Sequence, residues 1–146
     1  MAQEDAVNTW TKSELDKIAR AEELEIATRR RDGTLRDAVT VWMVRVGDDL
    51  YVRSVKGRAG AWFRAAVARN QGRIKAGGLQ RDVTFVEAKG APGDEIDRGY
   101  RAKYGRYAAS IVNTVLTPQA RAATLRLVPN VDARSTSRAT SHVKKQ

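Results

Sequence analysis

The sequence predicts an α+β fold, a small barrel of about six antiparallel strands accompanied by three helices. Two observations support it: several short stretches alternate apolar and polar residues, and tight glycine turns join most of them, as in sequential antiparallel strands. Stretches with helical periodicity stand before, between and after these strands, without the regular βαβ alternation or glycine fingerprint of a dinucleotide fold. A chain of 146 residues with 42% hydrophobic residues suits one domain with its own core.

Composition narrows the functional classes. No apolar run is long enough to span a membrane, and the first residues lack the pattern of a signal peptide, so we expect a cytoplasmic protein. The absence of cysteine excludes disulfides, thiolate nucleophiles and zinc–thiolate sites. The net charge is +10, but +3 of it lies in the tail and the rest is spread along the chain, so the charge does not by itself predict a nucleic-acid partner. We divide the chain into a flexible N-terminus (1–9), one domain (10–129) and a disordered basic tail (130–146).

The first half of the domain contains the clearest local signals. Thr11 and Glu14 have the spacing of a capping box at the start of a helix that would run to about Arg20. The Asp32-Gly33 pair predicts a hairpin turn, because glycine accepts positive φ. A long return strand is expected over 35–46; it is apolar on both faces, as in a barrel strand covered outside by helices.

The remaining elements follow from the same patterns. A strand is expected over 50–55, a helix over 61–70, a short strand over 73–76 and another strand over 82–88. One long amphipathic helix is predicted from Asp94 to Val115, with a possible bend at Gly99 or Gly105, and Pro118 is expected to close it. A last strand is predicted over 122–128.

The strongest chemical signal is a cationic, glycine-containing loop that leads into the helix at 61–70. Phosphate needs donors from several directions and a close approach of the backbone, and a helix N-terminus adds free N–H groups. We therefore predict an anion site in this loop. Its donors would be Arg53, Ser54, Lys56, Gly57, Arg58 and Gly60.

Aromatic residues flank this loop and could border a planar ring. Tyr51 and Trp62 are the candidates for ring contact, whereas Trp42 is expected in the core. Tyr104 with Lys103 is a weaker candidate for proton donation, because tyrosines at helical spacing usually pack on the barrel. The run Arg29 to Arg31 is best interpreted as a solvated hairpin tip.

Other chemistry finds no support in the sequence, and no catalytic residue can be named. His142, the single histidine, lies in the tail, and Asp48 with Asp49 is explained by turn formation. Since no cluster has metal-ligand spacing, no metal site is predicted, and there is no nucleophile elbow or Walker loop.

Read together, three segments resemble an uncharacterised bacterial family, number 2255 among the domains of unknown function. They are ATRRRDGTLRDAVTVWMVRVGDDLYVRSVKGRAGAWFRAAVARNQGRIKAGG, DEIDRGYRAKYGRYAASIV and ATLRLVP, and the resemblance covers about residues 10 to 129. More distantly, the order of motifs is similar to that of the deazaflavin-dependent nitroreductases. Arg30 to Gly33, Ser54 to Gly57 and Trp62-Phe63 stand where those proteins have an Arg-x-x-Gly hairpin, a Ser-Lys-Gly loop and a Trp-aromatic pair.

This resemblance implies a split β-barrel like that of FMN-binding oxidases, which are usually homodimers. It implies that the basic loop binds the phosphate of a flavin- or deazaflavin-type cofactor, and that the protein could act as an oxidoreductase. The alternative from another class is a non-catalytic module that binds a small ligand or nucleic acid through the basic loop and tail.

Overall fold

The structure, a computed structural model of the chain, describes residues 9–88 and 92–130. The predicted flexible N-terminus and basic tail therefore lie, except for Thr9 and Asn130, outside the described residues. The strands are β1 (Leu24–Thr28), β2 (Val39–Val41), β3 (Met43–Val46), β4 (Asp49–Arg53), β5 (Gln71–Ala76), β6 (Leu79–Glu87) and β7 (Thr124–Pro129). The helices are α2 (Lys12–Arg20), α3 (Ala61–Arg69), α4 (Gly93–Tyr104), α5 (Ala109–Val112) and α6 (Pro118–Ala122), with 3₁₀ turns η1 (Gly57–Ala59) and η2 (Asn113–Val115).

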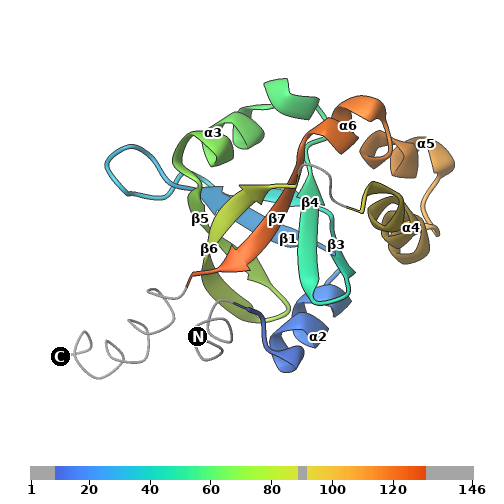
Figure 1. The fold of residues 1–146 in the computed structure, drawn as a ribbon, viewed down its shortest axis with the longest axis horizontal. Helices are drawn as coiled ribbons and strands as arrows, with labels where there is room; N and C mark the ends of the chain where they lie inside the picture. The colour runs from blue at the N-terminus through green and yellow to red at the C-terminus, as the bar shows by residue number, and fades with distance from the viewer. Residues whose placement is uncertain (1–8, 89–91, 131–146) are drawn as a thin grey trace.

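The strands form one antiparallel sheet in the order β2-β1-β5-β6-β7-β4-β3. Strands β2 and β3 stand at opposite ends of this order, although only Trp42 separates them in the chain. The sheet therefore curls until its two edges nearly meet, giving the split, barrel-like architecture in Figure 1. This confirms the predicted α+β class and barrel, with seven strands among the described residues instead of about six.

Two predicted elements are wrong in extent. The single strand expected over 35–46 is divided at Trp42, because β2 pairs with β1 whereas β3 pairs with β4. The single helix expected over 94–115 ends at Tyr104 and resumes as α5 and η2. Its buried stripe is interrupted after Tyr104, since Tyr107 is 37% and Ile111 48% exposed, whereas Val115 is buried.

Pro118 also has a role other than the predicted one. It does not close a helix; it occupies the first turn of α6, where the missing N–H of proline costs nothing. Thr117 caps this helix by accepting a hydrogen bond from the Ala120 amide at 3.1 Å.

Other local predictions are confirmed. Thr11 and Glu14 form the reciprocal capping box at the start of α2. Gly33 adopts φ 91° in the hairpin turn, and β1 pairs antiparallel with β2. The helix expected over 61–70 is α3, which ends at the left-handed Asn70 (φ 61°), so that the chain turns directly into β5 at Gln71.

Two hydrophobic clusters stabilise the fold. The first fills the barrel, where α2 and α3 close its two ends (Figure 1). The second lies between the outer face of β3 and β4 and the helix α4, and its largest members are Tyr100 and Tyr104. Met43 belongs to the inner cluster and Val44 to the outer one, so β3 is buried on both faces as its sequence predicts.

Candidate functional site

A cavity of about 500 Å³ lies beside the edge strand β2, at the split of the barrel. Four segments form most of it: β2 with Trp42, the end of β4 with the residues that follow it, the start of α3, and the segment of α5 and η2; Glu23 lies beside them. Most of its lining is apolar. The lining residues are Glu23, Val39, Thr40, Val41, Trp42, Arg53, Ser54, Val55, Lys56, Gly60, Ala61, Trp62, Ile111, Thr114 and Val115.

The predicted loop delivers the N-terminus of α3 to this cavity. Gly60 is the N-cap residue and offers no side-chain cap, so the N–H groups of the first helical turn have no acceptor within the helix. A Cβ atom at position 60 would stand 2.6 Å from Ser54 Oγ. Glycine therefore lets Ser54 approach the helix start, where its hydroxyl donates to the Gly57 carbonyl at 2.8 Å.

The loop itself depends on a positive φ at Gly57. This residue has φ 74°, and a Cβ there would also stand 3.2 Å from Gln119 Cβ of α6. Gln119 donates a hydrogen bond to the Val55 carbonyl at 3.1 Å. Helix α6 thus supports the loop from behind, which leaves Lys56 on the cavity side.

Arg53 lies at the base of the cavity, and its guanidinium is engaged within the protein. Its Nη1 donates to Asp97 Oδ1 at 2.5 Å and to the Val115 carbonyl at 2.9 Å. Nε donates to Thr124 Oγ1 at 3.1 Å, and Nη2 to the Gly93 carbonyl at 3.3 Å.

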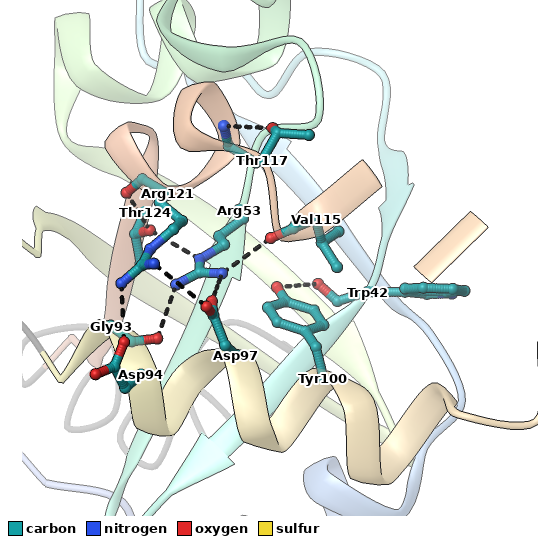
Figure 2. Close-up of polar contacts among 11 residues, drawn as sticks. Trp42, Arg53, Gly93, Asp94, Asp97, Tyr100, Val115, Thr117, Arg121 and Thr124 are labelled. Carbon is teal, nitrogen blue, oxygen red and sulfur yellow. Dashed lines mark hydrogen bonds and ion pairs between the residues drawn. The ribbon is translucent and has the colours of Figure 1, made fainter. Parts of the chain in front are cut away.

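This Arg53 network, drawn in Figure 2, ties β4 to α4, η2 and β7. The side chain of Arg53 is 1% exposed and its partner carboxylate 10% exposed. Arg121 contributes a second cation to Asp97, at 3.4 Å. Sequence reasoning missed Asp97, because its only signal was a carboxylate on the buried stripe of α4.

Three of the predicted ligand residues, Gly57, Arg58 and Tyr51, lie outside the cavity lining. Arg58 forms a two-pronged ion pair with Glu87 and donates to the Ala122 carbonyl, with its guanidinium 5.2 Å from the centre of the Phe63 ring. Tyr51 is 5% exposed and belongs to the outer hydrophobic cluster. The structure thus brings Arg53, Ser54, Lys56, Gly60 and Trp62 to the cavity, and holds Gly57 just behind it.

Trp42, expected in the core, is partly buried and lines the cavity. Its indole stacks on the Tyr104 ring with centroids 4.0 Å apart and an interplanar angle of 6°. Its carbonyl accepts a hydrogen bond from the Tyr100 hydroxyl at 3.4 Å. The ring is therefore held from one side by the outer cluster.

The Lys103–Tyr104 pair lies away from the cavity lining. Lys103 Nζ donates to the Met43 carbonyl at 3.0 Å, and burial lowers the pKa of Lys103 to about 8. The Tyr104 hydroxyl donates to the Glu22 carbonyl at 2.8 Å, and burial raises the pKa of Tyr104 to about 12. These contacts anchor α4 on β3.

The remaining polar candidates have structural partners. Arg29 and Arg30 donate to carbonyls of their own hairpin, at Gly33 and Leu35. The Asp32 carboxylate accepts hydrogen bonds from the Thr34 amide and hydroxyl. These bonds lower the pKa of Asp32, and the bond from the hydroxyl has the largest effect. Within the described residues no group of three His, Cys, Asp or Glu could hold a metal ion. His142 lies outside them.

No helix in the described part of the chain is long and apolar enough to cross a membrane.

Comparison with known proteins gives a family and a fold. The model for uncharacterised proteins conserved in bacteria (DUF2255) matches residues 14–127. No protein with a curated description matches. Among solved structures, the conserved hypothetical protein Rv2991 of Mycobacterium tuberculosis is similar with a TM-score of 0.52 at 11% identity, over 86% of this chain and 82% of that one.

Two further solved structures are similar at lower TM-scores. An F420 reductase has a TM-score of 0.48 at 16% identity, over 79% of this chain and 90% of that one. The FAD and heme binding protein of Mycobacterium smegmatis has a TM-score of 0.48 at 20% identity, over 86% of this chain and 69% of that one.

Proposed function

The chain belongs to the DUF2255 family of bacterial proteins, and from the geometry of its cavity we propose that it binds a flavin- or deazaflavin-type cofactor carrying phosphate. The observation that carries the proposal is the cavity at the split of the barrel, which joins an apolar, Trp-lined body to a cationic helix start. We further propose that the loaded protein is an oxidoreductase.

The body of the cavity suits a planar, largely apolar ring. Its volume of about 500 Å³ lies within the usual range of about 300–1,000 Å³ for small-molecule sites. Trp42 and Trp62 come from different elements, and the aliphatic side chains of Val41 and Val115 complete the walls. Such a lining excludes water and orients a ring, which are two of the tasks that a protein performs for a redox cofactor.

The loop end of the cavity suits phosphate. Lys56 brings a full charge, and the first turn of α3 brings N–H groups that favour an anion. The Arg53 charge is compensated by Asp97, so Arg53 shapes this end more than it attracts an anion. When bound, the cofactor would supply hydride chemistry, and the chain would supply position, exclusion of water and phosphate anchoring.

A titration of the purified protein with FMN, and separately with a deazaflavin, tests the proposal. We expect quenching of cofactor fluorescence at micromolar concentrations. Lys56→Ala should weaken binding at least about tenfold, since a charge-assisted hydrogen bond contributes about 1.5–3 kcal/mol. Lys17→Ala is the matched control, because Lys17 is exposed on α2 at the opposite end of the barrel (Figure 1). The proposal would be refuted if neither FMN nor the deazaflavin were quenched.

A homodimer forms a second part of the proposal. Val39, Val55 and Ile111 are exposed by 39%, 45% and 48%, and all three line the cavity. A second copy covering this rim would remove apolar surface from water and close the cavity. Sedimentation velocity at micromolar concentration should show a dimer that Ile111→Glu converts to a monomer; a monomeric wild type contradicts this part.

A further inference from the structure

The edge strand β2 offers backbone groups as well as side chains to the cavity. In an antiparallel strand, the N–H and C=O of one residue point to the same side, and successive residues alternate between the two sides. Arg29 donates its N–H to the Gln71 carbonyl of β5, whereas the Thr28 carbonyl accepts from Arg36 on the hairpin side. Along β1, the backbone groups of the odd-numbered residues therefore point to β5 and those of the even-numbered residues to β2.

This alternation fixes the orientation of β2. Leu24 is paired with Val41 and Ile26 with Val39, so the backbone groups of these two valines are the ones that bond to β1. The N–H and C=O of Thr40, between them, consequently point away from β1. Strand β2 is the edge of the sheet, and no other strand among the described residues lies on that side.

The free edge of β2 lies beside the cavity. Thr40 and its neighbours Val39, Val41 and Trp42 all line the cavity, with the residues that follow β4 across from them. Outside the ladder with β1, the Thr40 N–H and C=O have no hydrogen-bond partner within residues 9–88 and 92–130, whereas the nearby Trp42 carbonyl is occupied by the Tyr100 hydroxyl. The cavity wall thus carries one donor and one acceptor side by side.

We propose that the backbone edge at Thr40 recognises the lactam or imide edge of a planar heterocycle held in this cavity. Such an edge has a ring N–H adjacent to a ring C=O, which complements the Thr40 C=O and N–H as a second strand would. The apolar walls at Val41 and Trp62 strengthen these two hydrogen bonds by excluding water. The inference rests on the proposed function and deepens it, because it assigns the end of the ring that faces β2.

The ligand itself provides the first test. FMN and its 3-methyl derivative differ only at the ring N–H of the imide, so 3-methyl-FMN cannot donate to the Thr40 carbonyl. We expect it to bind at least about fivefold more weakly, the loss of one neutral hydrogen bond. Thr40→Ala keeps both backbone groups and should preserve this difference.

The protein provides the second test. Proline is tolerated in an edge strand where the N–H is outside the ladder, so Thr40→Pro removes the donor at a position where the strand does not use it. Thr40→Pro should bind FMN about fivefold more weakly than Thr40→Ala. In an amide exchange experiment on the wild type, the Thr40 amide should become protected on addition of FMN.

The outcomes separate the two proposals. If the wild type binds FMN and 3-methyl-FMN with equal affinity, Thr40 does not hydrogen-bond to the imide edge of the ring. The inference is then overturned, while the proposal of cofactor binding stands. Equal affinities of Thr40→Pro and Thr40→Ala for FMN overturn it as well. If the wild type binds neither FMN nor a deazaflavin, the proposed function fails and the inference falls with it. Should Thr40→Pro not fold, the comparison of the two ligands still decides.

Discussion

Asp97→Asn exchanges a single side-chain atom of the Arg53 network. We expect it to destabilise the protein more than any other exchange of one atom in this network. The substitution keeps the shape of the side chain but removes the charge that compensates a guanidinium 1% exposed to solvent. Breaking a buried ion pair from one side typically costs about 3–5 kcal/mol, because the remaining charge stays buried.

The surroundings of Arg53 place the expected loss at the lower end of that range. Its guanidinium keeps the Val115 and Gly93 carbonyls and the Thr124 hydroxyl as acceptors, and the asparagine oxygen can still accept a hydrogen bond. Loss of the charge also leaves Arg121 with Asp94 as its remaining carboxylate. We therefore expect Asp97→Asn to lower the free energy of unfolding by about 3 kcal/mol.

Urea unfolding at pH 7, followed by far-UV circular dichroism, measures this change. Asp94→Asn is the matched control: Asp94 also contacts Arg121, but its side chain is 83% exposed, so the loss should stay below about 1 kcal/mol. A loss of less than about 1 kcal/mol for Asp97→Asn would refute the reasoning, because the buried guanidinium would then need no counter-charge. Equal losses for the two variants would do the same.

Three further predictions concern the loop, pH and the tail. Gly60→Ala should lower the free energy of unfolding by about 1–2 kcal/mol, because its Cβ would displace Ser54 Oγ. In a double-mutant cycle of urea unfolding, Ser54→Ala should remove most of this loss, since the remaining contacts of the Cβ start at 3.3 Å. Burial lowers the pKa of Lys103 to about 8, so the unfolded state binds more protons above that pH. After allowance for solvent screening, the free energy of unfolding should accordingly rise by about 1 kcal/mol between pH 8 and 10. It should then fall above pH 10, because tyrosines ionise in the unfolded chain. Lys103→Met should abolish the rise. Truncation after Asn130 keeps all of β7 and should change the melting temperature by less than about 2 °C, whereas a larger loss would show that the tail docks on the domain.

Local signals in the sequence predicted local structure well. The capping box at Thr11 and Glu14, the hairpin at Gly33 and the helix that starts after Gly60 are each specified by neighbours within a few residues. Predictions that required a choice between long-range partners did less well. Nothing near Trp42 indicates that β2 and β3 pair with strands at opposite ends of the sheet.

The candidate site shows the same division. The sequence predicted a cationic loop at a helix start, and that loop does border the cavity. It could not show that Arg53 is bound by Asp97, 44 residues away in the chain, or that Arg58 turns to Glu87. Charge and glycine content are properties of a segment, whereas the direction of a long side chain depends on the acceptors that folding brings near it.

The sequence by itself thus determined the class of fold, the position of the turns and the chemistry available in the loop, because these depend on short-range periodicity and backbone preference. Only the tertiary structure decided which of those groups meet. The curl of the sheet leaves β2 as an edge, and packing of α4 neutralises Arg53. The cavity between Trp42 and Trp62 exists because three separate parts of the chain converge there: β2, the loop that leads into α3, and the segment of α5 and η2.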